Sequence, residues 1–375
     1  MRIAVLAHIR NPISEPFKGG MEAHCRSLCD GLRRKGHDVV LFASSGSEDP
    51  HLFPICDFPY DDVLPWDEFR GTPELYDYQA KAFANAWREI EAGDFDVVHN
   101  NSLFVEVIEW ADRTGFPCVT SQHVPPFRLM SEQVCAARSP TSLFTVTSQS
   151  QRPLWPADCL DKIRVVANGV DCAFWKPASE VGNHFVWAGR ITPNKGLAEA
   201  VAAAGEANAQ LRIFGPIEDK TYYNTMIAPN LTDAIAYCGH RDRDLLAREF
   251  ARAKGMLLTP MWDEPFGLVA AEALACGTPV IAFDRGAMRE VVASCGTVVP
   301  RGDVGAMARA MASIETISRQ ECRRHAERHL SIDAMIEGYE DCYASVFSGK
   351  RVDRSAEAKA SASRSSVSST AELLA

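Results

Sequence analysis

The stretch LLTPMWDEPFGLVAAEALACGTPVIA, residues 257–282, sets the pattern for the whole chain. A short apolar run, 256–258, predicts a buried strand and leads into a turn rich in proline and acid. A helix-forming run, 268–275, follows and stops before Gly277, a residue type favoured just past a helix end. The apolar run 279–283 predicts the next parallel strand. This pattern is typical of a βαβ unit, whose loop lies where open α/β sheets bind ligands.

The start of the predicted helix has the chemistry of an anion site. Proline at 265 loses no N–H there, and Gly267 lets a ligand approach the backbone. The free N–H groups and the helix dipole favour a phosphate. Glu264 precedes this point, and Glu272 follows Gly267 at roughly 7–8 Å along the helix axis. Because ionised carboxylates only accept hydrogen bonds, they suit hydroxyl groups on either side of a phosphate, as in a diphosphate with a sugar at each end.

The run EPFGL at 264–268, with Glu272 eight residues after Glu264, resembles the glutamate-seven-glutamate motif of retaining glycosyltransferases of family four, the glycosyl transferases group 1. That family has the GT-B fold. The resemblance implies an α/β protein with two Rossmann-like doubly wound domains facing a cleft. It also implies that Glu264 contacts the donor sugar, Glu272 contacts the nucleotide ribose, and Phe266, Gly267 and Leu268 lie against the donor phosphates. For Glu272 alone, a solvated face of a crossover helix is the alternative.

Two cations lie in a second motif, GRITPNKG at 189–196, just past the predicted strand 185–188. Arg190 offers a fork of donors and Lys195 a point charge. Solvated loop side chains are the ordinary alternative for this pair. The motif is similar to the donor-diphosphate motif of the same family, which implies that both cations stabilise the leaving nucleoside diphosphate electrostatically. The two cations would then replace a metal ion, so we expect no metal and no cofactor, only the nucleotide sugar as substrate.

The beginning of the chain predicts another βαβ unit, with strands at 2–7 and 39–43 and a helix at 21–35. The loop between the first strand and this helix ends in a glycine pair but lacks the Gly-x-Gly-x-x-Gly fingerprint of dinucleotide sites. In the resembled family such a loop lies against the donor diphosphate and sugar, which makes Gly20 the candidate. A flexible turn is the alternative reading of the glycine pair.

His123 follows the predicted strand 117–121, at the edge of the sheet where ligands bind. A lone histidine is more often structural, but the resembled family usually has a histidine in this loop. There it supports the donor sugar as positive charge develops at the anomeric carbon. His99 is a weaker candidate of the same kind. Arg241 aligns with a family position that faces the nucleobase and is often small and apolar, so the identity of the nucleotide stays open.

Asn-Gly at 168–169 is a turn signal, and the resembled family commonly has this motif at the boundary between its two domains, which implies a linker at about 168–182. We expect residues 1–168 to form the acceptor-side domain and residues 169–330 the nucleotide-sugar domain. An amphipathic helix at 331–347 would return to the first domain. Residues 44–73 predict a long loop with interspersed aromatic residues. Residues 349–375 are rich in serine and alanine and predict a disordered tail.

Composition narrows the function classes. The 375 residues, 46% hydrophobic and 23% charged, suffice for two domains. A formal net charge of −10 argues against nucleic-acid binding. No apolar run reaches the ~20 residues of a membrane span, and we expect a cytoplasmic protein. The 12 cysteines contain no Cys-x-x-Cys pair and are expected to be buried thiols rather than a metal site or disulfides.

The resemblance implies a hexosyltransferase that moves a sugar with retention from a nucleoside-diphosphate sugar, with a UDP-sugar as first choice, to a hydroxyl acceptor. The acceptor would be a soluble or lipid-linked saccharide. Membrane contact would be peripheral at most: residues 1–168 carry 16 Lys and Arg against 23 Asp and Glu, although Arg26, Arg33, Arg34 and Lys35 cluster on one predicted helix. A nucleotide-sugar epimerase, a sugar phosphorylase, and a non-catalytic sugar-nucleotide sensor remain as alternatives.

Overall fold

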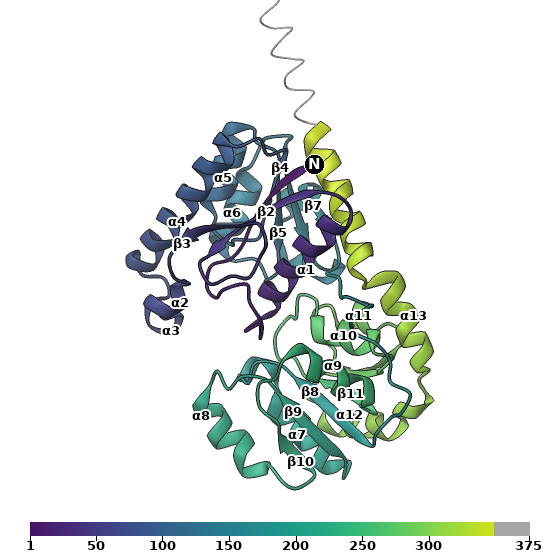
Figure 1. The fold of residues 1–375 in the computed structure, drawn as a ribbon. Coiled ribbons are helices and arrows are strands. Elements are labelled where there is room, and N and C mark those ends of the chain that lie inside the picture. The colour runs from purple at the N-terminus through teal and green to yellow at the C-terminus, as the bar shows by residue number, and fades with distance from the viewer. Residues whose placement is uncertain (349–375) are drawn as a thin grey trace, which may run out of the picture.

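The computed structural model describes residues 1–348 and contains two parallel sheets, each covered by helices (Figure 1). The first sheet has the strand order β3-β2-β1-β4-β5-β6-β7, and the second has the order β10-β9-β8-β11-β12-β13. In each sheet the chain starts in the middle, winds to one edge, and then winds to the other. The predicted fold class, two doubly wound α/β domains, is confirmed.

The first sheet consists of β1 (Arg2–Leu6), β2 (Asp38–Ser44), β3 (Leu52–Cys56), β4 (Val97–Asn100), β5 (Cys118–Gln122), β6 (Ser142–Val146) and β7 (Ile163–Val165). Its helices are α1 (Gly20–Arg34), α2 (Tyr60–Val63), α3 (Trp66–Phe69), α4 (Pro73–Ala92), α5 (Glu106–Thr114), α6 (Arg128–Ala136), and the 3₁₀ segments η1 (Gln149–Leu154) and η2 (Ala157–Lys162).

The second sheet consists of β8 (His184–Ala188), β9 (Gln210–Phe214), β10 (Ile235–Tyr237), β11 (Gly255–Leu258), β12 (Val280–Phe283) and β13 (Gly296–Val299). Around it lie η3 (Pro193–Lys195), α7 (Leu197–Glu206), α8 (Lys220–Tyr222), α9 (Arg243–Arg252), α10 (Leu268–Ala275), α11 (Met288–Val292), α12 (Val304–Ser313) and α13 (Arg319–His329). The helical turns η4 (Tyr223–Ile227), η5 (Ala228–Asn230) and η6 (Ile314–Thr316) complete it. A final helix spans 332–348.

The segment 44–73, which the sequence predicts as an irregular loop, contains the edge strand β3 and the short helices α2 and α3. Only Ile55 of β3 is fully buried. Pro54 interrupts the strand pattern, and a proline is tolerated at a sheet edge because one side of the strand donates no ladder hydrogen bonds. The strand is therefore real but weakly encoded.

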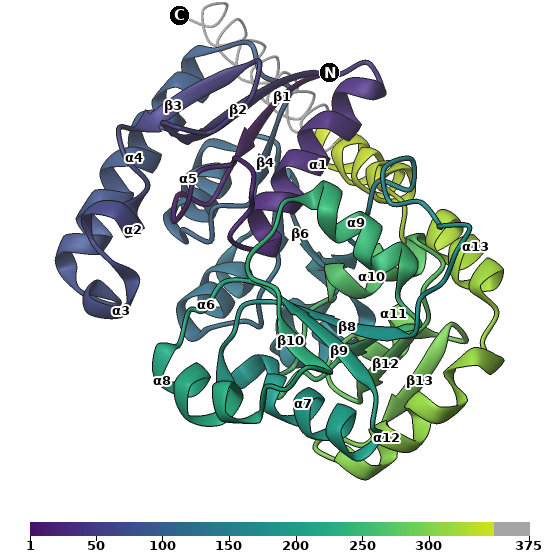
Figure 2. The same ribbon diagram turned by 60° about the horizontal axis from the view of Figure 1, so that its bottom comes forward.

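The helix 332–348 packs on the first domain, beside α1 and against the strands β1 and β2 (Figure 2). Gly31 of α1 allows a close approach, since a β-carbon there would lie 2.7 Å from side-chain atoms of Ile332 and Ile336. The chain thus leaves the first domain after β7 and returns to it at its end. The two crossings lie side by side, because Val170 N–H donates to Leu330 O at 2.8 Å and Ile332 N–H donates to Val170 O at 3.1 Å.

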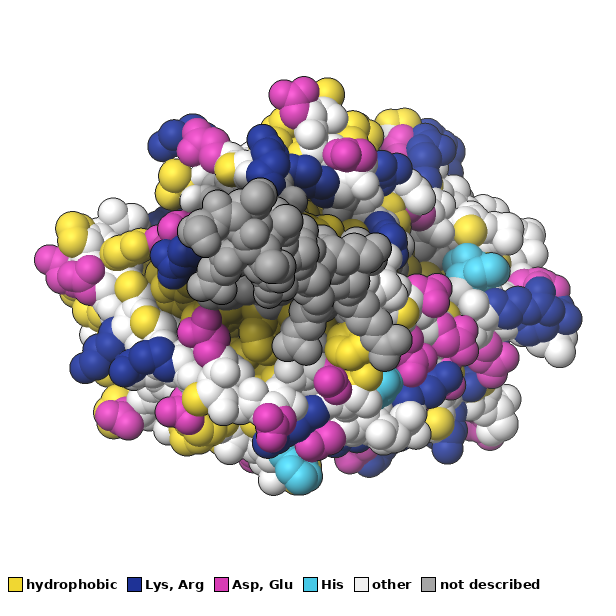
Figure 3. All heavy atoms as spheres, turned by 90° about the horizontal axis from the view of Figure 1, so that it is seen from above, with side chains coloured by type: hydrophobic (Ala, Val, Ile, Leu, Met, Phe, Trp, Pro, Cys, Tyr) yellow, Lys and Arg dark blue, Asp and Glu magenta, His cyan; other side chains and the backbone are white. Residues whose placement is uncertain are grey.

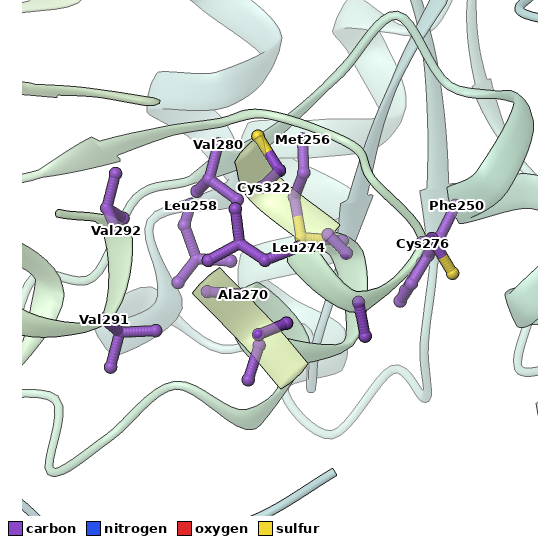
Figure 4. Close-up of a cluster of buried hydrophobic side chains, with 14 of the residues drawn as sticks. Phe250, Met256, Leu258, Ala270, Leu274, Cys276, Val280, Val291, Val292 and Cys322 are labelled. Carbon is purple, nitrogen blue, oxygen red and sulfur yellow. The ribbon is translucent and has the colours of Figure 1, made fainter. Parts of the chain in front are cut away.

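The core of the second domain surrounds α10 (Figure 4). Five of its eight residues are buried, and four of those five are alanines, so the helix approaches the strands β11 and β12 closely. Leu258, Val280 and Val292 pack near Leu274 in this core. Because α10 is enclosed on several sides, its first turn is held rigidly at the edge of the sheet that faces the first domain.

Within residues 1–348, no helix has the length and apolar character needed to cross a membrane. Residues 349–375, for which the sequence predicts a disordered tail, lie outside the described part of the chain. The face shown in Figure 3 carries acidic and basic side chains intermixed, with no large area of one sign outside the grey atoms.

Candidate functional site

The first residues of two helices, one from each domain, lie next to each other. Gly267 precedes α10 with a left-handed backbone, φ 87° and ψ 63°, and Leu268 is the first helical residue. Gly20 is the first residue of α1, and a β-carbon on it would lie 3.2 Å from Leu268 Cδ1. Unpaired N–H groups and the positive end of a dipole occur at each helix start. The space between α1 and α10 therefore favours an anion.

The loops after β8 and β11, two neighbouring strands, bring Lys195 and Glu264 together. Lys195 Nζ lies 2.6 Å from Glu264 Oε2 and 5.1 Å from the centre of the Trp262 ring. Trp262 Nε1 donates to the same carboxylate oxygen at 2.9 Å. The two loops touch at Gly196, where a β-carbon would lie 2.0 Å from Thr259 O. Glycine is therefore required at 196 for this close approach, which places the cation against the carboxylate.

Arg190 has a partner that the sequence did not indicate. Its Nη1 donates to Glu218 Oε2 at 2.7 Å, in the loop after β9, and Glu218 Oε1 lies 3.5 Å from Nη2 of Arg10 in the first domain. The carboxylate of Glu218 thus connects Arg190, which is predicted to bind the donor diphosphate, with Arg10 on the opposite side of the cleft. Its position past the carboxyl end of a strand was the only sequence signal for it.

Glu272 lies just over one turn from the start of α10, next to a small cavity between the domains. The cavity, of about 20 Å³, has room for one water molecule. Burial raises the pKa of the Glu272 carboxyl to about 8, and the positive charge of Arg243 opposes this shift. Arg243 also pairs with Glu15 of the first domain at 3.1 Å. The lining residues are Ala23, His24, Ser27, Gly169, Val170, Asp171, Trp175, Arg243, Leu268 and Glu272.

His123 lies buried at the end of β5, and its Nε2 is 3.0 Å from Oδ1 of Asn101 at the end of β4. With the amide oxygen facing it, Nε2 carries the proton and Nδ1 is an acceptor. Nδ1 has no hydrogen-bond partner among residues 1–348. Burial lowers the pKa of His123 to about 4, so the ring is neutral. Asn101 is a functional candidate that sequence reasoning missed, although it stands in a polar cluster directly after a strand.

The ring of His24, on α1, lies 4.2 Å from that of His123, centre to centre. Neither ring nitrogen of His24 has a hydrogen-bond partner in the described chain. His99 is different, because its nitrogens face Tyr343 Oη at 2.5 Å and Ser121 Oγ at 2.8 Å. It joins β4 to the final helix and has no donor left for a ligand.

Arg241 follows β10, and its Nε donates to Cys238 O at 2.7 Å. The side chain therefore bends back over Gly239, whose φ is +86°. This contact leaves the outer edge of the guanidinium exposed beside the loop that is predicted to face the nucleobase.

No cluster of three or more His, Cys, Asp or Glu side chains suited to a metal ion occurs among residues 1–348. The chain has two Asp-x-Asp triplets, at 94–96 and 242–244. In the second triplet, Asp242 accepts the Leu245 N–H at 2.8 Å and so caps α9. All 12 cysteines are free.

The basic cluster on α1 is largely neutralised. Arg33 Nη2 lies 2.6 Å from Asp49, and Arg26 Nε lies 2.9 Å from Asp30. Lys35 is 3.5 Å from Glu337 on the final helix. Ion-paired side chains of this kind are poorly suited to attract an anionic membrane surface.

Comparisons with known proteins agree with this arrangement. The family model described as Glycosyltransferase Family 4 matches residues 18–174, and the model described as Glycosyl transferases group 1 matches residues 174–329. The chain is 28% identical over 348 residues to a D-inositol 3-phosphate glycosyltransferase of Stackebrandtia nassauensis, covering 78% of each chain.

Two solved structures are similar throughout their length. One is AviGT4, a glycosyltransferase involved in avilamycin A biosynthesis, with a TM-score of 0.70, 24% identity, and coverage of 93% of this chain and 98% of that one. The other is Anabaena Alr3699/HepE in complex with UDP, with a TM-score of 0.70, 17% identity, and coverage of 92% and 100%.

Proposed function

The chain belongs to the glycosyltransferases of family four, the glycosyl transferases group 1, and on that premise we propose that it transfers a hexose from a nucleoside-diphosphate sugar to a hydroxyl acceptor with retention of anomeric configuration. The donor occupies the second domain, and the acceptor approaches from the first. Transfer requires no metal ion.

The meeting of Lys195, Glu264 and the start of α10 carries this proposal. A cation and a helix start can hold a diphosphate. A carboxylate 2.6 Å from that cation can accept hydrogen bonds from the hydroxyl groups of the attached sugar. Only a ligand that contains both a phosphate and a sugar would contact Lys195, the start of α10 and Glu264 at the same time. Donors fixed in advance around a leaving diphosphate give electrostatic stabilisation without reorganisation during the reaction.

The donor is a UDP-sugar. Support comes from HepE, which has been solved with UDP and also with UDP-glucose, on the same fold. Glu272 accepts the ribose hydroxyls, while Arg241 and the backbone around Gly239 flank the base.

In the reaction, Lys195, Arg190 and the α10 start stabilise the charge on the departing UDP. An oxygen of its terminal phosphate takes the acceptor's proton on the face from which UDP leaves, which accounts for retention. His123, which is neutral and hydrogen-bonded to Asn101, faces the donor sugar as positive charge develops on the sugar ring. D-inositol 3-phosphate is a reasonable first acceptor to test, because relatives are named for it.

The test incubates the protein with UDP-, GDP- and ADP-hexoses, with and without EDTA, alone and with candidate acceptors. We expect release of UDP that is insensitive to EDTA and lost in Glu272→Ala. Loss of turnover with EDTA would refute metal independence. An epimerised nucleotide sugar as the product would identify an epimerase, and absence of nucleotide binding by calorimetry would refute the donor site.

A further inference from the structure

One carboxylate of the second domain binds the backbone of the first. Glu290, on α11, accepts the N–H of Gln149 at 2.8 Å and the N–H of Ser150 at 2.7 Å, one with each oxygen. These N–H groups open the 3₁₀ segment η1 and have no partner within that segment. Two charge-assisted hydrogen bonds from one side chain therefore span the domain boundary.

The residues just before η1 and just before α11 also contact the loop that carries Glu264. On the second-domain side, Ala287 N–H donates to Glu264 O at 2.9 Å. Gly286 approaches so closely that a β-carbon on it would lie 2.1 Å from Glu264 O. On the first-domain side, Thr147 Oγ1 donates to Pro265 O at 2.9 Å. Residues 147–150 and residues 286–290 therefore contact the same loop and also contact each other.

We propose that Glu290 is a positioning residue that clamps the two domains in the closed arrangement and thereby fixes the loop of Glu264 for transfer. The inference rests on the proposed donor site, which supplies the reason for placing Glu264. Glu290 is not one of the residues proposed to hold the donor or the acceptor. It acts through η1 and through the start of α11.

The clamp differs from the ion pairs that cross the cleft. Arg10 and Glu218 are 3.5 Å apart, and Arg243 and Glu15 are 3.1 Å apart; in both pairs two long side chains must be ordered at once. The Arg10 and Glu218 side chains are partly buried, whereas Glu290 is exposed, so the difference lies in how many side chains must be ordered and not in burial. The partners of Glu290 are backbone groups already fixed by η1, so only one side chain is ordered for two bonds.

The experiment removes the clamp from each side. Glu290→Gln keeps the shape but loses the charge and one acceptor. Gln149→Pro removes the N–H from the other side, and proline suits this first position of η1 because the preceding Ser148 is extended, with φ −156° and ψ 159°. Glu315→Gln is the control, since Glu315 is exposed and pairs with Lys254 of its own domain at 3.0 Å.

Three quantities are measured for each variant with UDP as the probe: the calorimetric Kd for UDP, the radius of gyration with and without UDP by X-ray scattering, and kcat with the donor identified above. We expect kcat to fall by up to about tenfold in Glu290→Gln, as for loss of one charge-assisted bond. The UDP Kd should change less than kcat, and the radius of gyration should rise. Gln149→Pro should do the same, and the effect of the double variant should be smaller than the sum of the two single effects.

Unchanged kcat and unchanged scattering in Glu290→Gln would overturn the clamp, and so would fully additive effects of the two substitutions. Failure of the wild-type protein to bind UDP would instead count against the proposed donor. Scattering without nucleotide would still test the clamp in that case, because the contacts of Glu290 join protein groups alone.

Discussion

The ammonium group of Lys195 contacts the carboxylate of Glu264 and the ring face of Trp262, and we expect it also to contact the donor diphosphate. We predict that Lys195→Ala lowers kcat by about 10²–10³-fold, the loss typical for removal of one preorganised charge partner of a leaving group. Steady-state transfer with the identified donor measures this. Lys254→Ala is a matched control, because both lysine side chains are 22% exposed and both pair with a glutamate. An equal loss in the two variants would remove the special role of Lys195.

Glu272 gives a prediction about protons. Burial raises the pKa of its carboxyl to about 8, so it is mostly protonated at pH 7. Ribose hydroxyls that donate to the carboxylate favour its ionised form and lower that pKa. Binding of UDP at pH 7 should therefore release up to one proton, seen as a dependence of the calorimetric enthalpy on the ionisation enthalpy of the buffer. Proton release of the same size in Glu272→Gln would show that another group is responsible.

Individual site residues differed in how far the sequence could indicate them. Lys195, Glu264 and Glu272 stand within short motifs, and local spacing placed the first two in loops after strands and Glu272 within the helix that follows. Glu218 and Asn101 have no such motif and acquire their partners only through folding. Glu218 meets Arg10 from a loop about 200 residues away in the chain, a contact that no local pattern encodes. His99 was named as a weaker candidate because it matches a frequent position of the resembled family, and the sequence could not show that both of its nitrogens are already bonded.

The two chain crossings between the domains depend on a glycine. A β-carbon at Gly169 would lie 2.5 Å from Ser331 O and 2.6 Å from Ile332 Cα, and both are backbone atoms that cannot rotate away. We predict that Gly169→Ala destabilises the protein by about 1–3 kcal/mol, the usual cost of overpacking. Urea unfolding followed by tryptophan fluorescence measures this change.

Gly205→Ala supplies the comparison. Gly205 lies in α7, and a β-carbon there would meet nothing within 4 Å. Alanine should stabilise this helix by about 0.5–1 kcal/mol, because glycine costs backbone entropy in a helix. If Gly169→Ala were as stable as Gly205→Ala, the crossing segments would have to be more adaptable than their hydrogen bonds indicate.

Among the secondary-structure elements, strong patterns were predicted well and weak ones were not. The helix predicted at 268–275 has the bounds of α10, since glycine stands at both ends and the interior is apolar. The strand β3 was missed because Pro54 breaks its alternation, and α6 was missed because only Met130 and Val134 are buried on it. Short elements on the periphery are stabilised by neighbours rather than by their own sequence.

The arrangement of the two domains was foreseeable as a fold but not as a set of contacts. The strand and helix patterns predict parallel α/β units, and the resemblance to family-four glycosyltransferases implies that two such domains face a cleft. The clamp of Glu290 on Gln149 joins residues 141 positions apart and uses backbone donors, which have no signature in the sequence. Closure of the molecule therefore has to be read from the structure, and its dependence on single carboxylates has to be measured.

Buried histidines make the stability of the first domain depend on pH. Burial lowers the pKa of His8 to about 4, of His99 to about 3 and of His123 to about 4. Burial and the neighbouring His123 and His99 also lower the pKa of His24. A histidine with a lowered folded pKa binds its proton more readily when unfolded. Its contribution is complete above the unfolded pKa of about 6.5 and is lost as the pH falls towards the folded value, by up to about 1.4 kcal/mol per pH unit.

We therefore predict that the free energy of unfolding of the first domain falls steeply between pH 6.5 and pH 4. Glu272 acts in the opposite direction, because its raised pKa makes the folded state bind the extra proton, but it is one group against four. Urea titrations at several pH values measure the slope. Glutamine in place of His99 keeps a donor and an acceptor beside Tyr343 and Ser121. The substitution His99→Gln should therefore lower the slope of the unfolding free energy against pH by the contribution of one titrating group. A slope that stays the same in His99→Gln would mean that His99 is not neutral and buried in solution, and the packing of the final helix on the first domain would then need to be reconsidered.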